Sequence, residues 1–286
     1  MRLRLWSGEV VGKGEGIGNS VIFAALVIFC LTLFAPMIWM SYSSFKTNSE
    51  IFMNAWSLPA RIDFQGFVDG WTDAEMGRTL LNSLVVVGIS MLLILALSLP
   101  AAYGFARLRF KGSNVLFLIF LSGLMIPEQS TIIPLYALFH RWEWLDTYQS
   151  VIFPYVAHGL PFSIFLLRAY FLTLPRELED AARIDGCSSF GVFLRIFLPL
   201  IKPGIATVVI FVTVILFNEL LMGMLFLTSD EHKTLPVMLY SFYGKHFSNY
   251  QMMFCTLSMI IFPLIAVFFV FQRHFVKGLT AGALKE

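Results

Sequence analysis

Long apolar runs, separated by short polar stretches, divide the chain. A helix that crosses the roughly 30 Å hydrocarbon core of a bilayer needs about 20 residues. Six runs have that length: Ser20–Met40, Leu81–Phe105, Val115–Phe139, Val151–Leu172, Gly204–Leu227 and Met252–Phe271. The pattern therefore predicts an all-α, polytopic membrane bundle of about six transmembrane helices.

The third run is the least regular of the six. Pro127 and Pro134 interrupt it, with Glu128 and Gln129 between them. Proline removes a helical hydrogen bond and clashes with the preceding turn. We therefore expect this helix to break at both prolines.

Composition agrees with a membrane location. Of the 286 residues, 58% are hydrophobic and only 13% are charged, and the mean hydropathy is +0.77. A soluble domain carries about 25% charged residues, so a soluble domain is excluded. The net charge of +2 gives no argument for nucleic-acid binding. Cys30, Cys187 and Cys255 lie far apart, which predicts neither a disulfide framework nor a cysteine zinc site.

The distribution of Lys and Arg predicts the orientation. Most of the 20 lysines and arginines fall on one side of the membrane when the N-terminus is placed inside. Positive charge favours the cytoplasmic side, so we expect a multi-pass membrane protein with both termini in the cytoplasm. The predicted organisation is a cytoplasmic segment 1–19, a transmembrane domain 20–275 and a cytoplasmic tail 276–286.

The cytoplasmic loop 173–202, between the fourth and fifth runs, predicts two short helices joined by a turn. Pro175 and the carboxylates that follow it favour the start of a helix, and Gly186 favours its end. Ser188 or Ser189 can cap the second helix. Two further prolines, Pro199 and Pro203, are expected to break the chain before the fifth run.

The residues of the first short helix allow two interpretations. Ala181 and Ala182 are small enough to let another protein approach closely, and the charges around them would set the register of that contact. Alternatively, the helix is a solvated face without a partner, as most charged helix faces are.

The loop resembles the "EAA" loop of the inner-membrane permeases of ABC importers. That pattern falls on Asp180, Ala181 and Ala182, then Gly186, then Ile196, Leu198 and Pro199. Asp180 replaces the usual Glu, which shortens the carboxylate by one methylene. The resemblance implies that the first helix seats in a cleft of an ATPase subunit and carries its motion into the spans. The residues that it implies for this coupling are Glu179, Asp180, Ala181, Ala182, Arg183, Asp185, Gly186, Ile196, Leu198 and Pro199.

Three other stretches resemble the carbohydrate-type branch, and in particular the shorter, six-span permease of maltose-type transporters. They are Ala101–Gly112, Met125–Tyr136 and Phe271–Ala283. The resemblance implies a location in the bacterial inner membrane, the type I permease fold and half of a translocation pathway for a carbohydrate or related polar solute. It also implies a second permease in a heterodimer, two ATP-binding subunits and an extracytoplasmic solute-binding protein. ATP and Mg²⁺ would be bound by the ATP-binding subunits, with no cofactor on this chain.

No motif for catalysis is found in the sequence. The stretch around Lys13 does not match a phosphate-binding loop, because Gly14 stands where Ser or Thr is required. The five histidines lack metalloprotease spacing. We therefore expect a protein that is not an enzyme. The alternative function is a secondary, ion-coupled transporter, which predicts inverted repeats and buried carboxylates but gives no reason for the 173–202 loop.

Polar residues within the spans are candidates for the translocation path. Asn218 and Glu219 lie well inside the fifth run, and Glu128 and Gln129 lie at the break in the third. Polar groups at membrane depth usually face protein or water. They either line the path or form hydrogen bonds between helices.

Two more polar groups lie near the ends of the runs. Asn82 and Ser83 open the second run and are expected at the membrane interface. The external loop Thr228–Tyr250 resembles the family loop that reaches the binding protein. Its candidate contact residues are Asp230, Glu231, His232 and Lys233. The alternative is a merely solvated loop.

Overall fold

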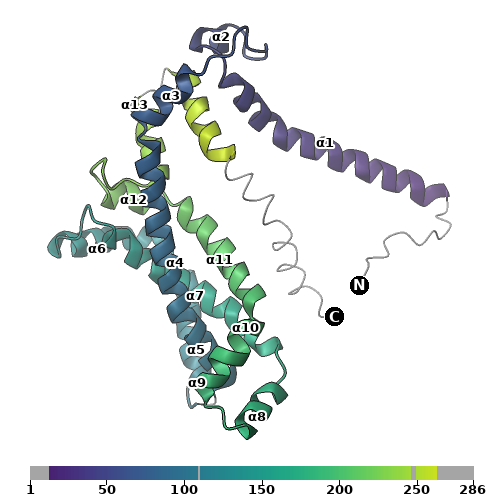
Figure 1. Cartoon of the computed structure of the whole chain (residues 1–286), viewed down its shortest axis with the longest axis vertical. Helices are drawn as coiled ribbons and strands as arrows, with labels where there is room; N and C mark the ends of the chain where they lie inside the picture. The colour runs from purple at the N-terminus through teal and green to yellow at the C-terminus, as the bar shows by residue number, and fades with distance from the viewer. Residues whose placement is uncertain (1–12, 109, 246–248, 263–286) are drawn as a thin grey trace. The chain divides into compact units, whose positions relative to one another are not determined.

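The computed structural model describes residues 13–108, 110–245 and 249–262. All regular structure in these ranges is helical (Figure 1), which confirms the predicted all-α class. The segment 1–12, the tail 276–286, the stretch Phe271–Ala283 and the second half of the predicted sixth span lie outside the described residues.

The chain forms two compact units. Within the described residues, the first contains the chain up to Gly70 together with 249–261, and the second contains Trp71–Lys245 and Phe262. In the first unit, α1 (Lys13–Ser43), α2 (Asn48–Met53), most of α3 (Gln65–Asp73) and the helix Tyr250–Phe262 are described.

The first unit is held by polar contacts between segments far apart in sequence. Gln251 Nε2 donates to Asp63 Oδ2 at 2.9 Å, and Cys255 Sγ donates to the Ser44 carbonyl at 3.1 Å. The ammonium of the fully buried Lys46 donates to the carbonyl of Ala55 at 3.0 Å. The first two bonds fasten the last described helix to the segment between α1 and α3, and the Lys46 bond joins two parts of that segment.

The second unit contains the remaining labelled helices. They are α4 (Met76–Arg107), α5 (Ser113–Ser122), η1 (Gly123–Met125), α6 (Glu128–Arg141), α7 (Gln149–Thr173), α8 (Glu177–Ile184), α9 (Ser189–Val192), the π-helical turn η2 (Phe193–Phe197), α10 (Leu198–Leu200), α11 (Lys202–Phe217), α12 (Leu221–Phe226) and α13 (Leu235–Lys245).

The core of the second unit is the packing of α4, α7 and α11 (Figure 1). The buried residues of α4 follow a helical stripe that includes Val86, Ser90, Ile94, Ser98 and Ala102. Several of them are small, and small residues allow helices to approach closely in a membrane. A Cβ at Gly159 of α7 would lie 2.5 Å from Ile94 Cδ1, so the Ile94 side chain of α4 occupies the space that a larger residue at position 159 would need.

Within the described residues, three helices are long and apolar enough to span a membrane, and the number of spans rises to five if each of two bent pairs counts as one. The long helices are Asn19–Ser43, Met76–Arg107 and Gln149–Thr173. The shorter apolar helix Tyr250–Phe262 is the described part of the predicted sixth span. This agrees with a bundle of about six spans.

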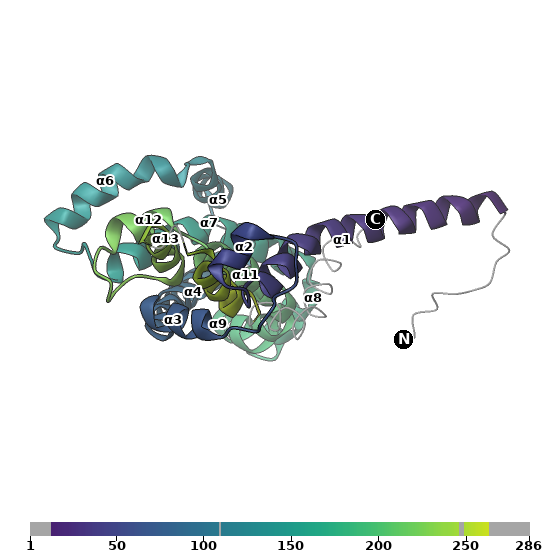
Figure 2. The ribbon, with the colours of Figure 1, turned by 90° about the horizontal axis from the view of Figure 1, so that it is seen from above.

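The third predicted span is a bent pair, and the prediction of a break at both prolines was half wrong. Helices α5 with η1 and α6 meet at 92° (Figure 2), and the break falls at Ile126 and Pro127. Ile126 is extended, with ψ 113°, because a residue before proline is pushed out of the helical region. Pro134, by contrast, lies inside α6 without ending it.

The predicted fifth span Gly204–Leu227 is not one helix, which corrects the sequence-based boundary. Helix α11 ends at Phe217, and α12 begins at Leu221. Two polar side chains explain the interruption. Asn218 donates to the Val214 carbonyl at 2.8 Å, and Glu219 accepts from the backbone N–H of Met222 at 2.8 Å. These side chains supply partners to backbone groups that a helix end leaves unsatisfied.

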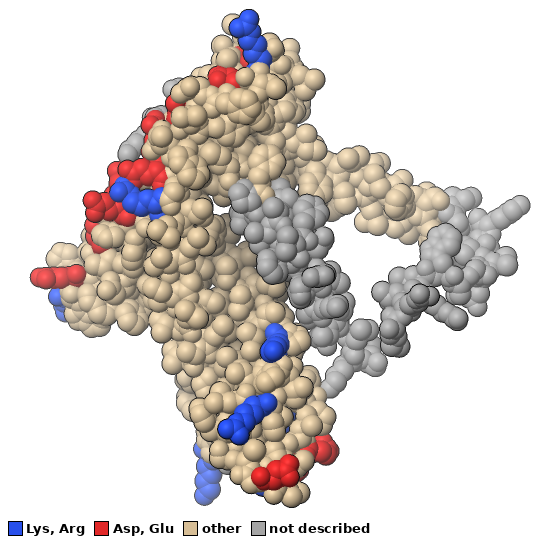
Figure 3. All heavy atoms as spheres, viewed as in Figure 1, with Lys and Arg blue, Asp and Glu red and all other residues tan. Residues whose placement is uncertain are grey.

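Charged side chains are sparse along the middle of the second unit. Between Arg78 and Arg107, α4 contains no charged residue. In Figure 3 the described Lys, Arg, Asp and Glu side chains near α8 gather at one end of the unit, and the surface over the middle of α4 is uncharged. This distribution is typical of a segment immersed in lipid or packed against apolar protein.

Candidate functional site

Helix α8 has one face fixed to the protein and one face exposed. Glu179 and Ala182 are buried, with 8% and 5% exposure, whereas Asp180 and Ala181 are exposed. Arg183 donates to Glu179 Oε1 at 2.7 Å. That hydrogen bond raises the pKa of Arg183. The small residue Ala181 therefore lies on the side of α8 that is open to a partner.

The end of α8 is set by Gly186, as the sequence predicts. The Gly186 N–H donates to the Arg183 carbonyl at 3.1 Å, and the Cys187 N–H donates to the Ala182 carbonyl at 2.9 Å. This pair of bonds is a Schellman motif, which needs a left-handed residue after the helix. Gly186 supplies it, with φ +80°.

The second short helix follows at once. Ser188 caps it by accepting from the Gly191 N–H at 3.2 Å, which confirms one of the two predicted caps. The chain continues through the π-helical turn and α10, and then bends by 72° into α11. Pro199 lies before the bend, and Pro203 lies in the first turn of α11. The prolines therefore bracket the bend, as predicted.

An aromatic cluster anchors this second arm to the bundle. Tyr103 of α4 packs against Phe193 and Phe197, with ring centroids 5.1 and 5.6 Å away, and against Phe171 of α7 at 5.6 Å. Phe171 and Phe197 are completely buried. Buried aromatic pairs of this kind contribute about 0.5–1.5 kcal/mol each beyond their area.

Arg107, at the end of α4, completes the anchor. Its guanidinium donates to the carbonyls of Phe171 at 2.5 Å and Leu174 at 2.6 Å, and it lies over the Phe197 ring at 4.8 Å. These carbonyls belong to the end of α7, where helical partners are missing. One side chain thus joins α4, α7 and the π-helical turn beside α8.

At the other end of α4, the loop 228–234 is fixed by several hydrogen bonds. Asn82 Nδ2 donates to the carbonyls of Glu231 at 2.8 Å and Lys233 at 3.0 Å. Ser83 Oγ accepts from the Leu235 N–H at 2.7 Å. Asn82 and Ser83 are thus buried, with 6% and 1% exposure, and bonded to the loop.

Asp146, between α6 and α7, holds the start of the same loop. Its Oδ1 accepts from the backbone N–H groups of Thr228 and Ser229, both at 2.9 Å. Burial alone would raise the pKa of Asp146, but the hydrogen bonds from Ser229 and Thr228, with the nearby His232, outweigh it and lower the pKa. Asp146 is left-handed, with φ 59°, although it is not glycine.

The predicted path residues come from two regions of the chain. Glu219 accepts from the Tyr155 hydroxyl of α7 at 2.6 Å and from the Gly223 N–H at 3.1 Å. Glu128 and Gln129 lie in the first turn of α6. Within the described residues, no hydrogen bond joins Glu128 or Gln129 to Glu219 or Asn218. The contacts of Glu219 favour a structural role for that residue.

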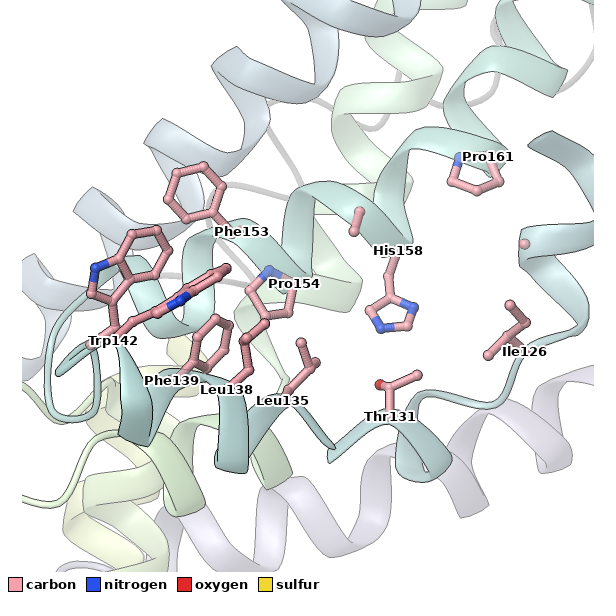
Figure 4. A pocket seen from close by; sticks show the side chains of 13 residues that line it. Ile126, Thr131, Leu135, Leu138, Phe139, Trp142, Phe153, Pro154, His158 and Pro161 are labelled. Atoms are coloured by element: carbon pink, nitrogen blue, oxygen red, sulfur yellow. The ribbon is translucent and has the colours of Figure 1, made fainter. Parts of the chain in front are cut away.

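A cavity of about 500 Å³ lies between α6 and α7. Figure 4 shows the imidazole of His158 pointing into it from α7, opposite Thr131 of α6. At its other end, Trp144 stacks on Phe139 and Phe153, with centroids 5.9 and 5.3 Å apart. The lining is mostly apolar, so the cavity offers few groups for a polar ligand.

Sequence reasoning missed the residues that organise both ends of α4. Arg107 and Tyr103 lie in the Ala101–Gly112 stretch, but their contacts are with residues of α7 and the π-helical turn. Asn82 was expected only at the membrane interface, and neither Asp146 nor Tyr148 was singled out. The one available signal was that Asn82 lies on the same helical stripe as the buried residues of α4.

Comparison with known proteins places the chain in a family. The family model for "Binding-protein-dependent transport system inner membrane component" matches residues 94–281. The "Probable ABC transporter permease protein YurM" of Bacillus subtilis is 34% identical over 269 residues, covering 94% of this chain and 89% of that protein.

Two other relatives have more specific names. The diacetylchitobiose uptake system permease protein NgcG of Streptomyces coelicolor is 32% identical, covering 93% of this chain and 89% of that protein. The trehalose/maltose transport system permease protein MalG of Thermococcus litoralis is 34% identical, covering 93% of this chain and 96% of that protein.

A solved structure has the same fold. It is a chain of a bacterial ABC transporter involved in the import of the acidic polysaccharide alginate, with a TM-score of 0.81 and 23% identity, covering 93% of this chain and 99% of that chain. This likeness confirms the predicted type I permease fold. In such transporters the permease is the non-catalytic subunit and ATP is hydrolysed by a separate one, which confirms that this chain is not an enzyme. The chain thus belongs to the family of inner membrane components of binding-protein-dependent transport systems.

Proposed function

We propose that this permease imports a carbohydrate or a related polar solute and forms half of the translocation pathway. The names of the relatives NgcG and MalG, which specify diacetylchitobiose and trehalose or maltose, support this class of cargo. In the proposal, residues 20–275 act as one transmembrane domain beside a second, different permease. Two ATP-binding subunits bind ATP and Mg²⁺, and an extracytoplasmic binding protein delivers the cargo.

The observation that carries the proposal is the exposed face of α8. Leu178 and Ile184 are apolar but 38% and 86% exposed, and Ala181 lies on the exposed side with them. Behind this face, Glu179 and Ala182 are buried, and the aromatic cluster ties the adjoining arm to α4 and α7. A short helix that is rigid on one side and open on the other suits a lever moved by an ATP-binding subunit.

The coupling role involves ten residues, and they divide into two groups. Contact with the ATP-binding subunit is proposed for the exposed Asp180, Ala181, Arg183 and Asp185, and the support and shape of the loop for Glu179, Ala182, Gly186, Ile196, Leu198 and Pro199. The division follows from burial and position, because the first group is exposed on or directly after α8, whereas the second is buried in α8 or lies at its end and in the following arm.

The coupling proposal can be tested by chemical protection. In a Cys30→Ser, Cys187→Ser background, which leaves the buried Cys255, Ala181→Cys should react with a membrane-impermeant maleimide in inside-out vesicles. Co-expression of the ATP-binding subunits should protect it. The matched control is Thr228→Cys, which should react in intact cells and whose labelling should not change when the ATP-binding subunits are co-expressed. Equal labelling of Ala181→Cys with and without the subunits would refute the proposed contact.

We also propose that Glu128, Gln129, Asn218 and Glu219 border the translocation path. The exposed Asn218 and Gln129 are the strongest members, since the carboxylate of Glu219 already has three donors. Asn218→Ala should reduce uptake without reducing membrane abundance, whereas Glu219→Ala should reduce both because it removes the cap of α12. Unchanged uptake by Asn218→Ala at normal abundance would contradict this assignment.

The loop residues Asp230, Glu231, His232 and Lys233 are proposed to contact the binding protein. Lys233 pairs with Asp230 at 2.6 Å and has only 13% of its side chain exposed, so the exposed Glu231 is the more accessible charge. Glu231→Lys should raise the binding-protein concentration needed for half-maximal ATPase stimulation in the reconstituted transporter. If the half-maximal concentration of binding protein is unchanged, this loop does not contact the binding protein.

A further inference from the structure

The loop 228–234 is unusually well fixed for a short connection rich in charged residues. Loops at protein surfaces are generally more mobile than the elements they connect. Here the start, the middle and the end of the loop each have a separate hydrogen-bonded support. Asp146 holds Thr228 and Ser229, Asn82 holds the carbonyls of Glu231 and Lys233, and Ser83 holds the N–H of Leu235.

Asn82 is the central support because its two bonds lie on either side of His232. The Tyr148 hydroxyl donates to Asn82 Oδ1 at 2.7 Å. This bond assigns the orientation of the amide, so that Nδ2 faces the two loop carbonyls. The Tyr148 ring also packs edge-on against His232, with centroids 5.3 Å apart. Asn82 therefore fixes the loop backbone on both sides of His232, and Tyr148 packs against the side chain of His232.

The backbone around this support is strained, and such strain is typical of functional sites. Asp146 and Glu143 both have positive φ, at 59° and 56°. Such conformations are unfavourable for residues other than glycine and persist only where the surroundings impose them. The left-handed Asp146 is the residue that presents its carboxylate to the two N–H groups at the start of the loop.

We propose that Asn82 is a positioning residue, assisted by Tyr148 and Asp146, that holds the 228–234 loop in its docking shape before the binding protein arrives. A preformed loop loses less conformational entropy on binding, which strengthens the complex without adding a contact. This inference rests on the proposed function, because it takes the loop to be the docking surface.

The test uses the complete transporter reconstituted in lipid, with the ATPase rate measured against the concentration of purified binding protein. Asn82→Ala should raise the half-maximal concentration about tenfold, as expected for losing two hydrogen bonds of ordinary strength, while the maximal rate changes less than about twofold. Tyr148→Phe should raise it by about threefold, since it removes one bond that only orients the amide. The double variant should be no worse than Asn82→Ala alone, because both act through one support.

Ser98→Ala is the matched control. Ser98 lies buried on the same helix, and its hydroxyl has no hydrogen-bond partner within the described residues. An unchanged half-maximal concentration in Asn82→Ala, or a fall in maximal rate alone, would overturn the inference. If the Asn82→Ala transporter fails to assemble, Tyr148→Phe is used instead, and an unchanged half-maximal concentration in that variant would overturn the inference. If Glu231→Lys has no effect, the docking role of the loop fails; if Glu231→Lys acts and Asn82→Ala does not, only the positioning role fails.

Discussion

At the scale of single residues, unusual backbone conformations mark the two ends of the second unit. Gly186 is left-handed after α8, and Asp146 is left-handed beside the 228–234 loop. Glycine adopts this conformation at little cost, whereas a residue with a Cβ is strained by it. The two positions therefore respond differently to substitution, because Asp146 already bears the strain and is compensated by its hydrogen bonds.

Gly186→Ala should weaken the function of the proposed lever. A Cβ at φ +80° costs about 1 kcal/mol, which corresponds to roughly a fivefold change in an equilibrium. We expect about fivefold less ATP-binding subunit to co-purify at limiting concentration, and Gly186→Asn should be milder because Asn tolerates this conformation. The control is Gly191→Ala, where an added Cβ meets only ordinary contact at 3.4 Å. If the Gly186→Ala and Gly191→Ala variants co-purify with equal amounts of the ATP-binding subunit, the proposed role of the turn at Gly186 is disproved.

The lowered pKa of Asp146 predicts how the 228–234 loop depends on pH. A carboxylate whose pKa is depressed by folding stabilises the folded form above its unfolded pKa, near 3.8, and loses that contribution as pH falls through the lower folded value. Hydrogen-exchange protection of the Thr228 and Ser229 amides should therefore stay constant between about pH 8 and pH 5. Asp146→Asn should lower that protection throughout this range. Loss of protection in the unsubstituted protein at about pH 5 would show that another group controls the loop.

At the scale of elements, the arm after α8 depends on aromatic packing more than on its own helices. Helix α9 has only 4 residues and α10 only 3. Helices this short are not stable by themselves, so tertiary packing must hold them. The contacts of Tyr103 with Phe193 and Phe197, and of Arg107 with the end of α7, provide that packing.

Phe197→Ala should destabilise this arm strongly. Removing a fully buried phenylalanine ring costs about 3–5 kcal/mol in water-soluble proteins, and here it also removes the ring under the Arg107 guanidinium. We expect a clearly lower thermal unfolding midpoint for the purified complex, with a smaller drop for Phe197→Leu. Phe190→Ala is the control, since that ring is 68% exposed. A midpoint lowered equally by both alanine variants would contradict the anchoring role.

Local signals in the sequence were sufficient for the short elements and insufficient for their anchors. The turn at Gly186 and the cap at Ser188 follow from the preferences of glycine and serine, which act within a few residues. Asn82, by contrast, bonds to residues 149 and 151 positions away, and Arg107 to residues 64 and 67 positions away. A single sequence contains no signal for such pairs until the fold brings them together.

The same limit explains the errors in the spans. Hydropathy marked where the apolar segments lie, but it did not reveal that α11 ends at Phe217, because Leu221–Phe226 is equally apolar. The end is fixed by the hydrogen bonds of Asn218 and Glu219. Pro134 lies inside α6 without ending it, and prolines within membrane helices are often tolerated in this way.

At the scale of the whole molecule, the distribution of charge leads to a prediction of topology. Both termini are expected on the cytoplasmic side, with the 228–234 loop outside. Green fluorescent protein fused to the C-terminus should fluoresce, and alkaline phosphatase fused after Thr228 should be active, since each reporter works on only one side. A phosphatase fusion within 173–202 should be inactive and serves as the control. The reverse pattern of activities would invert the proposed roles of the two loops.

The right-angled junction at Ile126 and Pro127 has a consequence for biosynthesis. Helix α5 has 10 residues and is only about 15 Å long, half the thickness of the hydrocarbon core. Neither α5 nor α6 can therefore leave the translocation channel and enter lipid as an independent, straight segment. Because α5 and η1 pack against α7, we expect this region to insert stably only once α7 has been made.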